Sequence, residues 1–362
     1  MKSKKIALVG FRLNGGGCGR VLANLSNYLF EQGIEVHIVI FHNDIGYDFS
    51  GTLFNLGKIK SESNTIFNKI KRFIHLKQYF TTHCFDYIID FRFRKSIIQE
   101  LLISKFIYNT KTIYTVHSSQ LEVYLPKSKF WTELIFGKSF KVIAITEGMQ
   151  DMILKKYPKL KNVEMIYNSI SIQQIQNKLN DNVCLNYNYI IGVGQFNTNE
   201  KQFDKLIEAY AKSKLASKEI HLVILGEGVL IESLKICARN NNVISKVHFL
   251  GFKNNPFKYI KHAKYLVMSS RYEGFGMVLI EALACETPVV AFNCPIGLNE
   301  IIQHNINGLL IEHQNVEALT NGMNTLIEDC DLYKHCKKNA LKSVEKFEIN
   351  NIGPQWLTLL NN

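Results

Sequence analysis

Residues 265–282, YLVMSSRYEGFGMVLIEA, decide the fold. Tyr265–Met268 is an apolar run without a charged residue, as expected for a parallel strand buried on both faces. A polar, glycine-containing turn follows, and the apolar spacing from Met277 onward is typical of a helix. Strand, turn and helix form half of a β-α-β unit, so this stretch indicates an α/β protein with an open parallel sheet.

The same alternation recurs on both sides of this stretch. Strands are predicted at Ile6–Phe11, Ile34–Phe41, Tyr87–Asp90, Thr112–His117, Val142–Thr146 and Val163–Tyr167, then at Tyr189–Val193, His221–Leu225, Val247–Leu250, Tyr265–Met268, Val289–Phe292 and Leu309–Glu312. Helical patterns such as Phe203–Lys212 and Met277–Cys285 lie between them. The two series predict two doubly wound, Rossmann-like domains, 1–168 and 169–349, divided in the Asn- and Gln-rich stretch Asn168–Asn188. We expect a C-terminal helix, 350–362, to pack back on the first domain.

Composition narrows the class of protein. The chain has 362 residues, of which 46% are hydrophobic and 20% charged, enough for two domains that need no disulfide or metal to fold. The eight cysteines, Cys184 among them, show no C-x-x-C spacing, and the eleven histidines form no H-E-x-x-H motif. The start, MKSKKIALVGF, is too short an apolar run for a signal peptide, and no run approaches the roughly 18 residues of a membrane span. These features predict a cytoplasmic protein with reduced thiols and no metal site.

The net charge of +12 is concentrated in the first half. Residues 1–167 hold 24 Lys and Arg against 13 Asp and Glu, and the remainder holds 19 against 18. Such a half favours an anionic partner: nucleic acid, a membrane surface or a phosphorylated substrate. A lysine-rich proteome is the alternative, although the second half lacks the excess. Asn64–Phe80 has the pattern of a basic amphipathic helix, which lies on an anionic membrane or forms a core helix with a solvated basic face.

Glycine-rich loops follow predicted strands in both halves. Asn14–Arg20, NGGGCGR, opens a helix, and its glycines let backbone approach an anionic ligand. The spacing is not G-x-G-x-x-G, which disfavours a nicotinamide site and leaves a plain turn as the alternative. In the second half Gly192–Gln195 is followed by Lys201, which either reaches a diphosphate or is a solvated surface lysine. His117, at a strand end, either orients an acceptor or sugar or is structural.

Two carboxylates eight positions apart carry the strongest signal. Glu273 lies in the loop before a helix, and Glu281 lies about two turns inside it, between apolar neighbours. Gly274 and Gly276 leave backbone N–H groups unshielded at the helix start, which suits a phosphate. One carboxylate is then placed for sugar hydroxyls and the other for a ribose; a surface carboxylate is the alternative for Glu281.

Together these residues resemble the retaining GT-B glycosyltransferases of family 4, the sucrose-synthase-like group. The resemblance is strongest over 189–315 and weaker over 4–170. It is carried by EGFGMVLIEAL from Glu273 onward, by GVGQF with Lys201, by LGEG, VHFLGF and TPVVAF, and by GGGCGR in the first half. It implies two Rossmann-like domains facing across a cleft.

The resemblance also implies roles for individual residues. Glu273 would contact donor-sugar hydroxyls, Glu281 would bind the ribose, and Lys201 would neutralise the leaving diphosphate. His117 would be the acceptor-side histidine. The remaining donor-site positions are Gly16 and Gly17 for domain closure on the diphosphate, Gly274, Phe275, Gly276, Met277 and Val278 for the phosphates, Phe252 and Lys253 near the base, and Glu300 in the last donor loop.

The chain departs from the family pattern at two positions. Gln195 stands where the family usually has arginine, and it lies one residue further from Lys201 than is commonest. This weakens the diphosphate site or shifts the second cation to Arg20 or Arg271. Gly19 stands where the first-domain loop usually has glutamate.

The expected function is retaining transfer of a sugar from a UDP-linked donor to a glycan or lipid-linked acceptor, in bacterial lipopolysaccharide, capsule or other surface polysaccharide synthesis. No metal or other cofactor is expected, because no D-x-D pair lies in the relevant loops. A setting at the anionic inner face of the membrane fits the basic first half. The alternatives are a non-transferase GT-B enzyme such as a nucleotide-sugar 2-epimerase, and a nucleic-acid-binding protein. Nucleic acid is not expected as a partner, because the basic residues are not interleaved with stacking aromatics.

Overall fold

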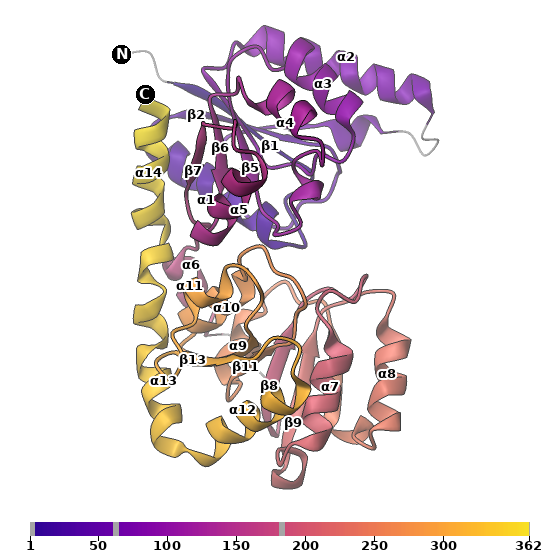
Figure 1. The fold of residues 1–362 in the computed structure, drawn as a ribbon, viewed down its shortest axis with the longest axis vertical. Helices are drawn as coiled ribbons and strands as arrows, with labels where there is room; N and C mark the ends of the chain where they lie inside the picture. Colours follow the sequence, from indigo (N-terminus) through magenta and orange to yellow (C-terminus); the bar gives the residue numbers. More distant parts are fainter. Residues whose placement is uncertain (1–3, 61–64, 181–184, 362) are drawn as a thin grey trace. The chain divides into compact units, whose positions relative to one another are not determined.

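A computed structural model describes residues 4–60, 65–180 and 185–361. Cys184, Asn64 and part of the Asn168–Asn188 stretch therefore lie outside the described residues. The chain forms two units, one of residues 1–170 with 349–362 and one of residues 171–348. Each unit is built on its own parallel sheet (Figure 1).

The first unit contains a seven-stranded sheet in the order β3-β2-β1-β4-β5-β6-β7. Its strands are β1 (Lys5–Gly10), β2 (Glu35–Ile40), β3 (Thr52–Asn55), β4 (Tyr87–Asp90), β5 (Lys111–Val116), β6 (Lys141–Ala144) and β7 (Val163–Met165), all paired in parallel. The sequence did not predict β3. That strand is short and only partly buried at the sheet edge, so it lacks the apolar run of the others.

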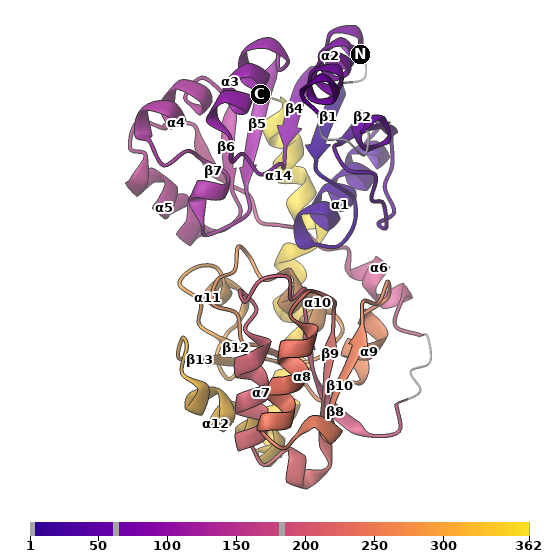
Figure 2. The same cartoon turned by 90° about the vertical axis from the view of Figure 1, so that its right-hand side faces the viewer.

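The helices of the first unit connect these strands. They are α1 (Gly17–Glu31), α2 (Ile66–His83), α3 (Ile97–Phe106), α4 (Lys129–Phe136), α5 (Glu147–Lys156) and the C-terminal α14 (Ile349–Asn361), with short 3₁₀ turns at Leu56–Ile59 and Leu121–Val123. α14 packs against α1 and buries Ile352, Trp356 and Leu360 (Figures 1 and 2). The last helix of the chain thus completes the core of the first unit.

The second unit contains a six-stranded parallel sheet in the order β10-β9-β8-β11-β12-β13. Its strands are β8 (Asn188–Val193), β9 (Ile220–Leu225), β10 (Val247–Gly251), β11 (Leu266–Met268), β12 (Val289–Phe292) and β13 (Gly308–Ile311). Its helices are α6 (Ile172–Asn177), α7 (Phe203–Lys212), α8 (Ile231–Asn240), α9 (Phe257–His262), α10 (Met277–Ala284), α11 (Leu298–Ile301), α12 (Val316–Glu328) and α13 (Cys330–Ser343), with 3₁₀ turns at Ala216–Lys218, Ile244–Lys246 and Glu345–Phe347.

One core cluster of the second unit fills the space between its sheet and α7, α8 and α12. Fully buried Leu206, Tyr210 and Leu319 belong to it. Figure 2 shows α7 and α8 side by side in front of the sheet. The predicted α/β class, with each predicted strand overlapping an observed one, is confirmed.

Both sheets reverse their strand order once. In the first unit the reversal lies between β1 and β4, and in the second between β8 and β11. Ligands of open α/β sheets bind beyond the carboxyl ends of the strands at such a switch point. The loops after β1, β4, β8 and β11 are therefore where a functional site is expected.

Candidate active site

An ion pair lies at the switch point of the second unit. The Nζ atom of Lys201, in the loop after β8, lies 2.6 Å from Oε1 of Glu273, in the loop after β11. The Glu273 side chain is 9% exposed and the Lys201 side chain 28%. The structure thus brings together the cation and the carboxylate that the sequence placed 72 positions apart.

Backbone contacts hold the two loops in register. The hydroxyl of Ser269 donates to the carbonyl oxygens of Lys201 and Gln202, each at 2.9 Å. The N–H of Arg271 donates to the carbonyl of Glu200 at 2.8 Å. The sequence alone indicated no role for Ser269. These hydrogen bonds show that its side chain fixes the loop from which Lys201 reaches Glu273.

Glycines let a third loop approach the first two. A Cβ on Gly226, whose φ is +144°, would lie 1.9 Å from the carbonyl oxygen of Gly194. A Cβ on Gly228 would lie 2.2 Å from the carbonyl carbon of Phe196. The Lys201 stem lies beside Gly194, where a Cβ would meet its Cγ at 3.4 Å. The sequence assigned no chemical role to the Gly226–Gly228 turn. In the structure this turn packs directly against the loop that carries Lys201.

Helix α10 begins with an open amino end. Its N-cap, Gly276, has φ +94°, no side chain caps its first turn, and that turn holds no acidic residue. The neighbouring predicted positions Phe275 and Met277 are buried, whereas Gly274 and Val278 are partly exposed. The uncapped N–H groups and the dipole of the helix favour an anion there.

Glu281 lies in the second turn of α10 and is 5% exposed. Burial of this carboxylate excludes the alternative of a solvated surface residue. A carboxylate is rarely buried unless a partner stabilises its charge, so this position has a structural or a binding role.

Ser270 and Cys294 extend this site, and sequence reasoning assigned neither. Cys294 donates its Sγ–H to the Ser270 carbonyl at 3.1 Å. Burial, reinforced by the Glu273 carboxylate, raises the pKa of the Cys294 thiol to about 12, so the thiol stays protonated at neutral pH. The hydroxyl of Ser270 is buried and makes no hydrogen bond within the described residues. Nothing in residue type signals these neighbours, because only the pairing of β11 with β12 places them together.

The other predicted donor positions are more open. Phe252 is 40% exposed after β10, and Nζ of Lys253 lies 6.0 Å from the centre of the Tyr259 ring. Gln195 is partly exposed directly after Gly194, and Glu300 is partly exposed in α11. These residues lie at the carboxyl edge of the sheet, and their places in a donor site stay predictions.

In the first unit the glycine loop lies at the start of α1. Asn14 donates to Asp44 at 2.8 Å and accepts from the N–H of Gly15, whose φ is +63°. The Tyr47 hydroxyl accepts from the N–H of Gly16 at 3.1 Å. A Cβ on Gly16 would meet nothing within 4 Å, so the loop is open where the sequence predicts close approach of a ligand.

Gly19, where the family usually has glutamate, has no room for a side chain. A Cβ there would lie 2.9 Å from the carbonyl oxygen of Arg12. The path of this loop therefore leaves no space at position 19 for the glutamate side chain that the family usually has there.

His117 follows β5 and stays neutral. Its Nε2 lies 2.8 Å from the Thr115 hydroxyl, and its ring stacks on Phe91 at 5.5 Å. Burial, reinforced by the charge of Arg94, lowers the pKa of His117 to about 3. Asn168 lies close enough to oppose this shift, but Nδ1 has no partner at hydrogen-bond distance among the described residues. The unpaired Nδ1 is itself buried, so the acceptor-side role of His117 stays a prediction.

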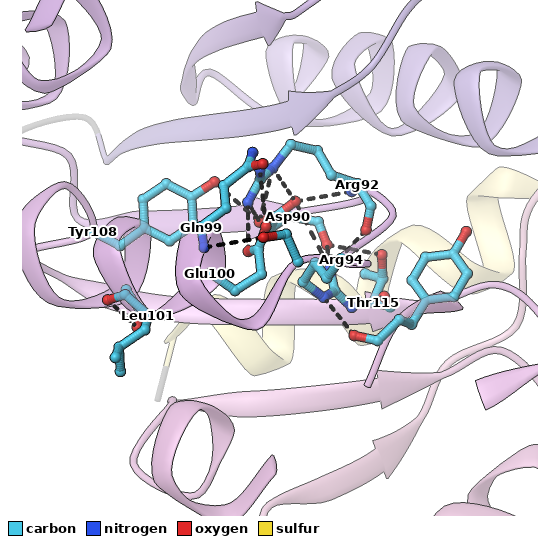
Figure 3. A network of polar contacts seen from close by, with 11 residues as sticks. Asp90, Arg92, Arg94, Gln99, Glu100, Leu101, Tyr108 and Thr115 are labelled. Carbon is cyan, nitrogen blue, oxygen red and sulfur yellow. Dashed lines mark hydrogen bonds and ion pairs between the residues drawn. The ribbon is translucent and has the colours of Figure 1, made fainter. Parts of the chain in front are cut away.

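A buried charge cluster lies beneath this region (Figure 3). Arg92 donates to Asp90 at 2.7 Å and to Glu100 at 3.0 Å, and the Tyr108 hydroxyl donates to Asp90 at 3.0 Å. Arg94 donates to the carbonyl oxygens of Asp90, Arg92, Thr115 and Tyr124. Sequence reasoning missed the cluster, although DFRFR at residues 90–94 places three charges at the end of a buried strand.

The cluster connects β4 to β5 and so fixes the loop that carries His117. Asp90, Arg92, Arg94 and Glu100 are each at most 3% exposed. Charges are buried at such depth only when they are paired and hydrogen-bonded, as these are.

The described residues contain neither a metal-binding cluster nor a membrane-spanning helix. No group of three or more His, Cys, Asp or Glu side chains there is arranged to hold a metal ion. Among the helices of these residues, none combines the length and apolarity that crossing a membrane requires.

Two known protein families together match almost the whole chain. The family described as "Glycosyl transferases group 1" matches residues 174–343, and "Glycosyltransferase Family 4" matches residues 15–174. An N-acetylgalactosamine-N,N'-diacetylbacillosaminyl-diphospho-undecaprenol 4-alpha-N-acetylgalactosaminyltransferase of Campylobacter jejuni is 29% identical, with 96% of this chain and 97% of that protein covered. An amylovoran biosynthesis glycosyltransferase of Erwinia amylovora is 26% identical, with 99% of both covered.

Solved structures share the fold at lower identity. Staphylococcus aureus TarM, crystallised as a mutant with fondaparinux, alpha-GlcNAc-glycerol and UDP, superposes with a TM-score of 0.79 at 17% identity, covering 99% of this chain and all of that one. Anabaena HepE in complex with UDP-glucose superposes with a TM-score of 0.77 at 19% identity, covering 99% of both chains.

Proposed function

The chain belongs to the family 4 glycosyltransferases of GT-B fold, and from that membership we propose that it moves a sugar from a UDP-linked donor to a lipid-linked glycan with retention of configuration. One observation carries the proposal. The Lys201–Glu273 pair lies at the switch point beside the uncapped amino end of α10. A cation, a carboxylate and a helix amino end without a side-chain cap are what a nucleotide diphosphate sugar requires.

Each of these groups stabilises a charge that develops during the reaction. When the bond between sugar and phosphate breaks, the diphosphate gains negative charge and the sugar becomes oxocarbenium-like. Lys201 and the N–H groups of α10 stabilise the diphosphate, because preorganised positive charge lowers the energy of that transition state. A diphosphate drawing Lys201 away releases Glu273 to accept hydrogen bonds from the sugar. Glu281 then binds the ribose.

Retention is proposed from the family membership, and the route to it from the lack, among the described residues, of an assigned covalent nucleophile beside Glu273. Cys294 is close to it, but its raised pKa keeps the thiol protonated and weakly nucleophilic. We therefore propose attack from the face that the diphosphate leaves, with a departing phosphate oxygen taking the acceptor proton. Lys201 supplies the cation of the site, so turnover requires no divalent metal.

The acceptor proposal rests on the relatives. The Campylobacter protein is named for a diphospho-undecaprenol acceptor and the Erwinia protein for amylovoran biosynthesis. A lipid-linked glycan of a lipopolysaccharide, capsule or related pathway, used at the inner face of the membrane, fits both. No structural observation favours a 2-epimerase or a nucleic-acid-binding protein.

The test is turnover of UDP-sugars with an undecaprenyl diphosphate glycan in EDTA. Proton NMR of the product reports the anomer at the new linkage. We expect the α-anomer from an α-linked donor, at a rate that EDTA leaves unchanged. A β-linked product would disprove retention. Loss of activity in EDTA with rescue by Mg²⁺ would disprove the metal-free site, and free sugar formed at equal rate without acceptor would indicate an epimerase or hydrolase.

A further inference from the structure

Helices α3 and α4 present an apolar row to solvent. On α3 the exposed side chains Ile98, Leu102 and Phe106 recur at every fourth position and are 74%, 40% and 59% exposed. α4 packs beside α3 and adds Phe130 at 64% and Leu134 at 40%. Large apolar side chains that are exposed together mark an interaction site more often than chance.

Each of these two helices has one carboxylate, and each carboxylate is paired with a basic side chain. Glu100 of α3 is buried against Arg92, and Glu133 of α4 pairs with Lys159 at 3.7 Å. Exposed lysines lie on α3 and α4 and in the segments next to them, and they are Lys95, Lys105, Lys127, Lys129 and Lys138. The α3–α4 surface therefore combines exposed apolar side chains with exposed positive charge.

A hollow of about 380 Å³ opens between the carboxyl ends of α3 and α4. Lys105, Lys111 and Lys138 line it together with Tyr108, Leu134 and Phe140, and no carboxylate does. Lys105 and Lys138 pair with no described residue. The two helix ends contribute roughly half a negative charge each, so Lys105 and Lys138 alone leave a positive excess for an anion.

We infer that this α3–α4 surface docks on an anionic bilayer, with the apolar row among the acyl chains and a phospholipid phosphate in the lysine-lined hollow. Apolar residues flanked by lysines are the composition that favours insertion at the interface of anionic lipids. A soluble protein partner of acidic character would match the lysines but would not need the row of bare Ile, Leu and Phe side chains.

The row also leads toward the candidate acceptor region. Phe93, 45% exposed at the end of β4, contacts the ring of Tyr124, which in turn lies beside His117. Phe93 follows β4 at the edge of the sheet where His117 lies, and α3 begins four residues later at Ile97. The inference rests on the proposed function in one respect, which is that a lipid-linked acceptor reaches His117 from a bilayer.

This surface differs from the one that the sequence suggested. The sequence left Asn64–Phe80 as either a membrane-surface helix or a core helix, and α2 does expose Phe67, Ile70 and Ile74. However, the hollow is lined by residues of α3, α4, β5 and the loops between them and by none of α2. The two surfaces can be separated by substitution.

The experiment is co-sedimentation of the whole protein, without donor or acceptor, with vesicles of phosphatidylcholine alone or mixed with phosphatidylglycerol. We expect binding to the mixed vesicles only, weakened by salt because the contributing charges are exposed. Lys105→Gln/Lys138→Gln should weaken it roughly 25-fold, at about fivefold for each lost charge. Ile98→Ser/Leu102→Ser/Phe106→Ser should weaken it about tenfold or more. The positions are exposed, so an unchanged melting temperature verifies the fold.

Controls decide between this surface and its competitors. Val229→Ser/Ile236→Ser, at exposed positions of the second unit, should bind like wild type. The inference would be overturned if the α3 triple variant bound vesicles as wild type does. It would also be overturned if only the α2 variant Phe67→Ser/Ile70→Ser/Ile74→Ser lost vesicle binding. The same would follow from competition by millimolar glycerol 3-phosphate, which would assign the hollow to a soluble phosphate, or from a wild-type dimer that the triple variant converts to monomer. Activity is not measured, so the outcome is independent of the transferase proposal.

Discussion

Lys201 and Glu273 show what residue type and spacing can predict and where they stop. Each was identified from its motif, and their roles followed from the resemblance. Their contact at 2.6 Å depends on β8 and β11 being neighbours, which no local pattern states. The same limit hid Ser270 and Cys294, because a serine and a cysteine acquire meaning only from what lies across the sheet.

Replacing Lys201 with Met should lower kcat by about 10²–10³-fold, since one preorganised charge on the leaving group is lost. Steady-state kinetics with the UDP-sugar would measure it. Lys212→Met, which removes an exposed lysine paired with Glu208, is the matched control and should keep full activity. Equal kinetics for the two variants would remove Lys201 from the mechanism.

His117 makes stability depend on pH in a defined direction. Its pKa is about 3 in the folded protein and close to 6.5 when unfolded, so between these values the unfolded chain binds the extra proton. The stability it contributes is complete above pH 6.5 and is lost as the pH falls toward 3. Urea unfolding at pH 7 and pH 5 should therefore show a smaller loss for His117→Asn than for wild type. The exposed His262→Asn variant should behave as wild type, and an equal loss in all three proteins would refute the shift.

At the scale of elements, buried strands were predictable and irregular loops were not. Runs such as Ile6–Phe11 have only one stable place, inside a parallel sheet. β3 has no such run, and its existence depends on pairing with β2. The cluster of Asp90, Arg92 and Glu100 was missed for a related reason: charged residues suggest a surface until the partners that compensate them are known.

The Gly226 turn gives the prediction at this scale. Gly226→Ala should destabilise the second unit by about 1–3 kcal/mol, because the new methyl group would lie 1.9 Å from the Gly194 carbonyl at a φ that L residues rarely adopt. Thermal unfolding measures this cost. Gly251→Ala has a positive φ but nothing within 4 Å of its Cβ, so it should cost less. Equal costs would mean that backbone strain alone, and not the support of the lysine loop, requires glycine at 226.

At the scale of the whole molecule, the chain builds two sheets and then returns to the first. α14 buries Trp356 and Leu360 in the first unit although the preceding 178 residues form the second. The sequence expectation placed a helix at 350–362, and the observed α14 spans Ile349–Asn361 and includes Pro354. Hydrophobic spacing identifies such a helix, while the surface it covers depends on long-range packing.

Gly353 tests this closure of the first unit. A Cβ there would lie 2.3 Å from the Tyr28 ring of α1, so Gly353→Val should destabilise the first unit by about 1–3 kcal/mol through overpacking. Calorimetry should show the loss in the unfolding transition of the first unit. This is the transition whose temperature UDP does not change. A loss confined to the UDP-sensitive transition would contradict the packing of α14 on α1.

The binding of a nucleotide by the second unit is the central claim, and one measurement tests it most directly. The melting temperature is recorded with UDP, GDP or ADP for wild type, Glu281→Ala and the exposed control Glu317→Ala. A ligand at 100 times its Kd adds about 2.7 kcal/mol of stability, which is easily detected. UDP alone should raise the melting temperature of wild type and Glu317→Ala, with a smaller rise in Glu281→Ala. No rise with any of the three nucleotides, or an equal rise in Glu281→Ala, would contradict the donor site described here.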